Sequence, residues 1–334
     1  MKTILSLLLV IALISCKKAN TSTNNNSNSN TTNNSNSNVN DTCWVNYENI
    51  QNATSVEIDK NDTKWFVAVG GLYSFDSKWN YFACSNYFFN QLVVNPINMQ
   101  KKLYGMYGLT TFDGTTFNYQ DSINHMYLSV VAAQYDDQGN LWIVNGPTSS
   151  SWNANLININ NSTINFNLNK YTGVLVGKMK YHNNQLWIAG GYNGLIKYDI
   201  SQNTVIETFN QSNSMIGSNN IVDMVFDNLG NLWVATEEGG ISKYDGKIWE
   251  NFNSVNSGLI HNMTTSIAVD KYNNIWVGTG KGLSKYNNSI WTNYTTSNSK
   301  ILDNGVIDIA VDKQDNKWIV TGEGVSKLSK TKTN

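Results

Sequence analysis

The sequence predicts an all-β fold, a seven-bladed β-propeller whose blades are four-stranded antiparallel sheets. The first observation is an aromatic residue inside a short apolar run, which recurs at spacings of 39, 38, 45, 46, 43 and 42 residues. The second is strand-like alternation without helical periodicity, and the third is an N-terminal strand that completes the last repeat. The recurring aromatic residues are Trp65, Tyr104, Trp142, Trp187, Trp233, Trp276 and Trp318.

Composition supports a folded domain and argues against nucleic-acid binding. The chain has 334 residues, and its 40% hydrophobic content is enough for a sizeable core, which excludes a fully disordered chain. Its net charge is −1, and every basic residue is Lys. A near-neutral chain without Arg lacks both the excess positive charge and the bidentate donor that nucleic-acid binders use.

Residues 1–15 are expected to be a lipoprotein signal peptide. Lys2 precedes an apolar run that ends in Leu13-Ile14-Ser15-Cys16, which resembles a bacterial lipobox. The resemblance implies cleavage before Cys16 and attachment of lipid to its thiol. The alternative is an ordinary signal peptide with an incidental Cys.

Residues 16–42 are predicted to be the lipidated Cys and a disordered tether. Twenty of the 21 residues in 20–40 are Asn, Ser or Thr, which leaves almost nothing to bury. We therefore expect a domain held by lipid at the bacterial outer membrane, with Lys17 and Lys18 compatible with that sorting. Whether it faces the periplasm or the cell surface stays open.

Each repeat divides into four strands. In the clearest copy, a first apolar strand leads through the turn 227–231 to the strand that holds Trp233. The third strand is 240–244, and the turn Asp245-Gly246 leads to the fourth at 249–252, with Asn, Asp and Gly supplying the turns.

The seventh repeat lacks its fourth strand, and residues 44–47 match 291–294 almost residue for residue. The N-terminal strand is therefore predicted to complete the last blade and close the ring. This places the propeller at 43–329 and leaves 330–334 as a tail.

The pattern Asp-x-x-Gly-Asn-Leu-Trp-Val at 227–241 and its variants at 270–283 and 312–325 resemble the two-component regulator propeller repeat. Propellers of that family often form the periplasmic sensor half of histidine kinases, some of which respond to glycans. The resemblance implies a sensor-like binding module. No kinase module is visible after the repeats, so we expect the propeller as a stand-alone unit.

One candidate site is the face where the loops between second and third strands meet the blade-joining loops. Trp152 lies there in an insertion at 145–153 and is a candidate stacking platform for a sugar or partner chain. The alternatives are that Trp152 packs back on its blade and that the face is a solvated rim. The predicted ligand-binding residues are Trp152, Tyr107, Tyr192, Glu237, Lys281, Glu323, His125 and His261.

The innermost strands offer a second candidate. Alignment places Ser55, Gln91, Ala132, Lys178, Asp223, Ser266 and Asp308 at one equivalent position. Of these, Lys178, Asp223 and Asp308 are predicted to line the channel. The alternative is a local ion pair with buried water.

Metal and cofactor chemistry is not expected. The three His residues lack the close spacing of a zinc site, and His182 replaces a turn Asp. The turn acids lack the alternating acidic loop of a calcium site, so turn capping is the better interpretation. They are Asp59, Asp136, Asp227, Asp270 and Asp312. Cys43 and Cys84 are expected at opposite strand ends, which disfavours a bridge.

The leading hypothesis is a lipid-anchored, non-enzymatic module that binds an envelope protein or a glycan. One alternative is an enzyme resembling streptogramin lyases, which would need a metal and an acid–base pair. Glu237 and His261 are the best candidates for that pair in this sequence. Another is a structural subunit of an envelope complex, which would show an extended apolar patch.

Overall fold

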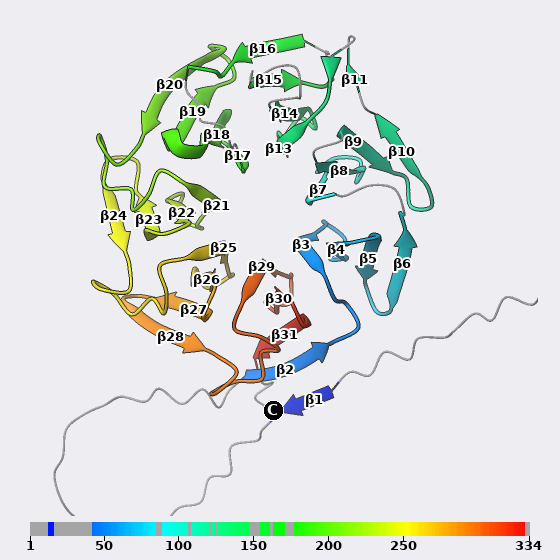
Figure 1. Ribbon diagram of the computed structural model, residues 1–334, viewed down its shortest axis with the longest axis vertical. Coiled ribbons are helices and arrows are strands. Elements are labelled where there is room, and N and C mark those ends of the chain that lie inside the picture. Colours follow the sequence, from blue (N-terminus) through cyan, green and yellow to red (C-terminus); the bar gives the residue numbers. More distant parts are fainter. Residues whose placement is uncertain are drawn as a thin grey trace, which may run out of the picture.

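The computed structural model describes residues 13–16, 42–84, 89–105, 108–120, 122–123, 126–146, 154–160, 163–170 and 177–330. Their strands form seven antiparallel sheets of four or five strands arranged as a ring, and one further sheet of two strands (Figure 1). The predicted all-β, seven-bladed propeller with four-stranded blades is therefore confirmed. The predicted leader and tether lie outside the described residues except for 13–16 and Thr42. No helix among the described residues is long and apolar enough to cross a bilayer.

The first four blades follow chain order. Blade 1 comprises β3 (Ala53–Ile58), β4 (Lys64–Ala68), β5 (Gly71–Phe75) and β6 (Trp79–Ala83). Blade 2 comprises β7 (Gln91–Val94), β8 (Lys101–Gly105), β9 (Gly108–Phe112) and β10 (Phe117–Gln120). Blade 3 comprises β13 (Val130–Tyr135), β14 (Leu141–Asn145), β15 (Asn155–Asn158) and β16 (Thr163–Asn167). Blade 4 comprises β17 (Met179–His182), β18 (Gln185–Ala189), β19 (Leu195–Asp199) and β20 (Thr204–Phe209).

The last three blades complete the ring. Blade 5 comprises β21 (Ile221–Phe226), β22 (Leu232–Thr236), β23 (Gly240–Tyr244) and β24 (Trp249–Phe252). Blade 6 comprises β25 (Thr264–Val269), β26 (Ile275–Thr279), β27 (Gly282–Asn287) and β28 (Ile290–Tyr294). Blade 7 comprises β29 (Val306–Val311), β30 (Lys317–Thr321), β31 (Gly324–Lys330) and β2 (Thr42–Tyr47), with β1 (Leu13–Cys16) beside β2.

Two small elements lie in the connections. The short hairpin of β11 (Ser122–Ile123) and β12 (Met126–Tyr127) joins blades 2 and 3. The 3-10 helix η2 (Gly191–Asn193) lies between the second and third strands of blade 4.

The N-terminal strand closes the ring as predicted. β2 pairs with β31 so that Trp44 lies opposite Leu328 and Tyr47 opposite Val325. Both aromatic side chains are buried, Tyr47 stacks on Trp318 at 5.8 Å between ring centroids, and Trp44 meets Tyr294 of blade 6 edge-on. One strand from the start of the chain therefore joins the last blade to its neighbours.

A hydrogen bond between an aspartate and a tryptophan is repeated in five blades. The aspartate begins the turn between the first two strands, and its carboxylate accepts a hydrogen bond from the indole Nε1 six residues later at 2.9–3.0 Å. The other carboxylate oxygen accepts backbone N–H groups within the turn. The pairs are Asp59–Trp65, Asp136–Trp142, Asp227–Trp233, Asp270–Trp276 and Asp312–Trp318. The turn-capping interpretation of these acids is confirmed.

Blades 2 and 4 depart from this pattern. In blade 2 the position of the tryptophan is held by Lys102, which lies opposite Val93 as Trp65 lies opposite Glu57. The alignment of Tyr104 with the tryptophans was wrong by two residues, because the aromatic signal outweighed the strand register. In blade 4 His182 replaces the aspartate, and the buried Nε1 of Trp187 has no hydrogen-bond partner in the part of the chain that the structure describes.

Three consecutive blade junctions add a lysine to the motif, which is buried at two of them and partly buried at the third. Lys64 of blade 1 lies 3.4 Å from the Asp312 carboxylate of blade 7, and its ammonium lies over the Trp318 ring. Lys317 relates in the same way to Asp270 of blade 6 at 3.2 Å, and Lys101 to Asp59 of blade 1 at 4.0 Å. The other four junctions have Leu or Ile at this position, namely Leu141, Leu186, Leu232 and Ile275.

We predict that a chain beginning at residue 49 is much less stable than one beginning at residue 41. Loss of each buried aromatic residue of β2 costs about 3–5 kcal/mol, and the β31 edge is left unpaired. Thermal unfolding followed by circular dichroism compares the two chains. Equal midpoints would show that the ring does not depend on this strand.

We also predict that Asp227→Asn lowers the free energy of unfolding by about 1–3 kcal/mol at pH 7, the range for hydrogen bonds to charged groups. Burial opposes ionisation of Asp227, but hydrogen bonds from Asn231 and Trp233 outweigh it and lower its pKa. A lowered pKa stabilises the fold above the unfolded-state value near about 4, and this contribution is lost as the pH falls through the folded-state pKa.

Urea unfolding between pH 3 and pH 7 measures this effect, with the variant losing less stability on acidification than the parent. Asp137→Asn, an exposed turn carboxylate in blade 3, is the matched control and should change little. An unchanged pH profile in Asp227→Asn would contradict the prediction.

Candidate binding site in the central channel

A cavity of about 330 Å³ occupies the middle of the ring, lined mainly by the innermost strands. Five of these strands carry a β-bulge, and a bulge re-aims the side chains that follow it. The first layer of the cavity wall includes Ser55, Gln91, Lys178, Asp223 and Asp308. Ala132 and Ser266 of the predicted ring are instead buried within the blades.

Two aspartates of this layer join neighbouring blades. Asp223 accepts the backbone N–H of Met224 at 2.9 Å and that of Ile267, from the next blade, at 3.0 Å. Asp308 does the same with Ile309 and Val56, both at 2.9 Å, across the junction between blades 7 and 1. All four carboxylate oxygens of these two aspartates therefore accept hydrogen bonds from the backbone of the ring.

Lys178 balances these two carboxylates. Its Nζ lies 3.9 Å from Oδ1 of Asp223. Burial disfavours the ammonium, but Asp223 and Asp308 outweigh it and raise the pKa of Lys178, so the side chain stays charged. Burial raises the pKa of Asp308 to about 6, with Lys178 opposing the shift. The predicted local ion pair is present, and a role of these residues in ligand binding stays a prediction.

A second layer lies two residues further along each inner strand, opposite the tryptophan of the second strand. It holds Glu57 in blade 1, Gln134 in blade 3 and Lys180 in blade 4. Neither Glu57 nor Lys180 has a hydrogen-bond or ion-pair partner among the residues that the structure describes. Burial raises the pKa of Glu57, and Lys180 is the charge that most strongly opposes this shift.

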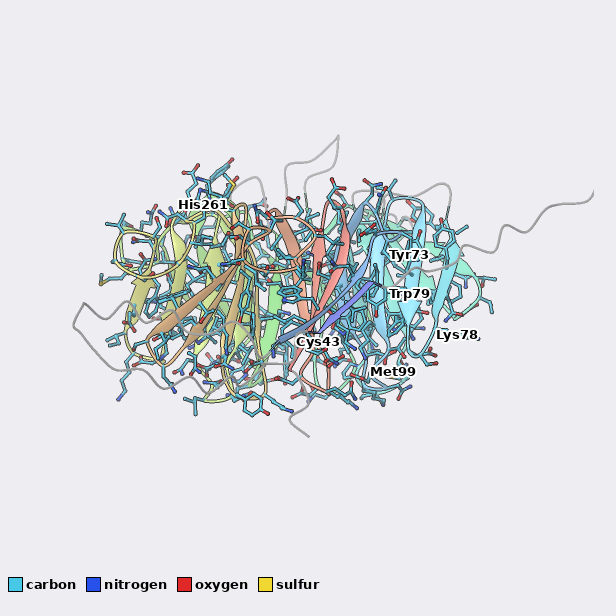
Figure 2. All side chains as sticks on the ribbon, turned by 90° about the horizontal axis from the view of Figure 1, so that it is seen from below. Cys43, Tyr73, Lys78, Trp79, Met99 and His261 are labelled. Carbon is cyan, nitrogen blue, oxygen red and sulfur yellow. The ribbon has the colours of Figure 1, made fainter. Side chains whose placement is uncertain are left out.

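The cavity continues toward the face that carries the turns between first and second strands. A second cavity of about 380 Å³ there includes Asp59, Lys60 and Met99, and it shares Glu57 and Val94 with the channel. Figure 2 shows Met99 near this face and His261 near the opposite one. The second layer is therefore the part of the channel closest to a second hollow.

The structure places the predicted loop-face residues on the surface and does not gather them around the cavity. Tyr192 is 61% exposed in η2, and Glu237, Lys281 and Glu323 are also exposed. His261 is partly buried in the loop between blades 5 and 6. None of these five lines the central cavity. Trp152, Tyr107 and His125 lie outside the described residues, so their binding roles stay predictions.

The acid–base pair suggested for a lyase-like enzyme is not formed. Glu237 and His261, both within the described ranges, share no hydrogen bond or ion pair. The carboxylate of Glu237 instead contacts the amide of Asn220, and Nδ1 of His261 is buried without a partner. Across the described part of the chain, no three His, Cys, Asp or Glu side chains cluster as metal ligands would.

Cys43 and Cys84 are not bridged to each other. Cys43 is in a disulfide, whereas Cys84 is a buried thiol. This agrees with the expectation that the two occupy strand ends too far apart for a bridge.

Sequence reasoning missed Glu57, Lys180 and Tyr104 as cavity residues. The hydroxyl of Tyr104 contacts Gln91 on the cavity wall, and burial raises the pKa of Tyr104 to about 12. An alignment of the inner strands at two positions, not one, could have found Glu57 and Lys180. Most other repeats have Ala or Val at the second position, so a charged residue there is unusual.

Comparison with known protein families identifies two of the repeats. The two-component regulator propeller family matches residues 215–238 and 258–281, so the predicted resemblance is confirmed for these repeats. No curated protein matches the chain.

Solved structures share the fold. The extracellular domain of a hybrid two-component system of B. thetaiotaomicron has a TM-score of 0.65 at 18% identity over 84% of this chain, which spans 40% of that chain. A streptogramin B lyase has a TM-score of 0.68 at 13% identity, covering 84% and 94% of the two chains. PorZ, a surface component of the type-IX secretion system of Porphyromonas gingivalis, has a TM-score of 0.68 at 16% identity. The match covers 86% of this chain and 51% of PorZ. At these identities the likeness shows the fold alone.

We predict that Lys178→Met destabilises the protein more at pH 8 than at pH 5. Without the ammonium, Asp223 and Asp308 are left as uncompensated buried charges, and the pKa of Asp308 rises further. A raised aspartate pKa means that the fold binds a proton more tightly than the unfolded chain, so stability falls as the pH rises from about 4 through the folded-state pKa.

Urea unfolding of parent and variant at the two pH values measures the difference. The matched control is Lys247→Met at an exposed turn, which should shift neither curve. An equal loss at both pH values would show that Lys178 acts only by packing.

Proposed function

Starting from a seven-bladed propeller that carries two-component regulator propeller repeats, we propose that this protein is a non-enzymatic binding module of the bacterial envelope. Its central channel takes a small polar ligand, and lipid on Cys16 tethers it to the outer membrane. The observation that carries the proposal is the pair of charged side chains, Glu57 and Lys180, that line the cavity and have no hydrogen-bond or ion-pair partner within the described ranges.

Physical chemistry supports a ligand at this position. Charged groups held in a narrow, partly desolvated cavity lose solvation without regaining it from a partner, which is costly for the fold. Such groups are otherwise paired, as Lys178 and Asp223 are. A concave site with a few convergent polar groups is also the usual form of a small-molecule site, and about 330 Å³ falls in the usual range of 300–1,000 Å³.

The likeness to sensor extracellular domains is consistent with recognition as the task. It is equally a likeness to lyases, so it does not choose between binding and catalysis by itself. The choice rests on the channel, where the first-layer carboxylates serve the backbone and the Glu57 and Lys180 groups remain for a ligand.

The lipid anchor makes a separate prediction. Cys16 lies opposite Cys43 in the register between β1 and β2, and Cys43 is in a disulfide. A thiol that carries lipid cannot form a disulfide, and cleavage before Cys16 would remove the rest of β1 with the leader. We expect the intact mass of membrane-extracted protein to show a diacylglyceryl Cys16, and Cys16→Ser to release the protein from membranes. An unlipidated mass would overturn the anchor while leaving the channel untouched.

We predict that filling the channel abolishes ligand binding. The test is a thermal-shift screen of the chain 41–334 against defined sets of amino acids, amines, carboxylates, nucleosides, and mono- and disaccharides. We expect one class to raise the unfolding midpoint, and Gln134→Trp to remove the shift because the indole occupies the cavity.

Tyr192→Ala and Trp152→Ala are the controls for the loop face and should leave the shift unchanged. A shift lost in these variants but kept in Gln134→Trp would move the site to the loop face. No shift with any class, alongside capture of an envelope protein, would favour a structural subunit.

A further inference from the structure

The first layer of the channel leaves no charge for a ligand. Both oxygens of Asp223 and of Asp308 accept backbone N–H groups that join adjacent blades. Lys178 lies beside Asp223 and is held charged by both aspartates. These groups satisfy one another, so a ligand would have to displace contacts that hold the ring together.

The second layer has the opposite character. Glu57 comes from β3 and Lys180 from β17, which lie on opposite sides of the ring (Figure 1). No ion pair joins them, yet Lys180 is the leading charge that lowers the pKa of Glu57. The two charges therefore act on each other across the cavity without contact, and the space between them is available to a ligand.

Charges of both signs act on this layer. Burial raises the pKa of Glu57, Lys180 and Lys178 lower it, and Asp308 and Asp223 raise it. Both lysines come from blade 4, two residues apart, so the positive charge lies on the side of the cavity away from β3. At the equivalent positions the wall has the amide of Gln134 in blade 3 and the apolar side chains of Val93 and Ala310 in blades 2 and 7. An occupant thus meets a carboxyl side, an ammonium side, and a wall with one amide and apolar groups between them.

We propose that the channel binds a small dipolar organic ion, such as a free amino acid, with its ammonium toward Glu57 and its carboxylate toward Lys180. This rests on the proposed function and names the ligand class of the same site. A neutral sugar would leave both charges unpaired, and a simple amine or carboxylate would leave one unpaired. Only a ligand with both charges satisfies the layer.

The matched probes are five-carbon compounds that differ only in charge: 5-aminopentanoate, pentylamine, pentanoate and 1,5-pentanediol. Glycine, alanine, glutamine and 4-aminobutanoate extend the dipolar set to other separations of the two charges. Isothermal titration calorimetry on the chain 41–334 at low salt measures each affinity. We expect the best dipolar compound to bind at least about tenfold more tightly than its matched amine, carboxylate or diol, as charge-assisted pairing requires.

Two variants test the assignment of each end. Glu57→Gln should lower the affinity for the dipolar ligand about tenfold and leave pentanoate binding unchanged, because the anion side is intact. Lys180→Met should do the reverse, sparing pentylamine. Both substitutions keep the size of the side chain, and thermal unfolding confirms that each variant is folded. Glu238→Gln and Lys247→Met, both exposed and outside the cavity lining, are the matched controls.

The outcomes separate this inference from the proposed function. One outcome is that a sugar or nucleoside binds, that Gln134→Trp abolishes this binding, and that Glu57→Gln and Lys180→Met leave its affinity unchanged. This outcome would overturn the dipolar ligand and keep the channel as the site. Absence of binding by every compound in both screens would overturn the channel site and this inference with it. A preference for dipolar ions that neither variant changes would overturn the assignment to Glu57 and Lys180.

Discussion

The hydrogen bond from a buried indole to a turn aspartate is the interaction on which the rest of the ring depends. In five of the seven blades it links the turn after the inner strand to the second strand of the same blade. Where a lysine of the next blade joins it, as Lys317 joins Asp270, the same carboxylate also specifies which blade comes next. Two of the three charged junctions, Lys317–Asp270 and Lys64–Asp312, flank blade 7, the blade assembled from both ends of the chain. Buried ion pairs often contribute little net stability but penalise wrong partners, which suits a site of ring closure.

Once the blades are set, their inner strands have two different tasks in the channel. The layer after each bulge is used by the fold, since Asp223 and Asp308 hold the backbone of adjacent blades together. The layer opposite the tryptophans is freed from that task, because the strands there are already held by their own turns. Glu57 and Lys180 occupy this second layer, and the proposed site rests on their having no hydrogen-bond or ion-pair partner among the described residues.

This division also explains why the loop face is the weaker candidate in the structure. Among its described residues, Tyr192, Glu237 and Lys281 are exposed and come from different blades, and none of them lines the cavity. Loops of a propeller converge only if they are long enough to reach one another, and several of these are short turns. The inner strands lie close together in any propeller, because each blade places its first strand beside the central axis.

The sequence by itself determined the repeat, the number of blades and the closing strand, because each depends on local alternation and on a residue pattern that recurs with a fixed period. It also placed Lys178, Asp223 and Asp308 at one level of the inner strands. Only the tertiary structure decided the register of blade 2, where Lys102 and not Tyr104 takes the tryptophan position. That register depends on which residue pairs with Val93, and the local residue pattern does not specify the pairing. It alone decided that Glu57 and Lys180 line the same cavity, because they lie 123 residues apart in the sequence and come to one cavity only when the ring closes.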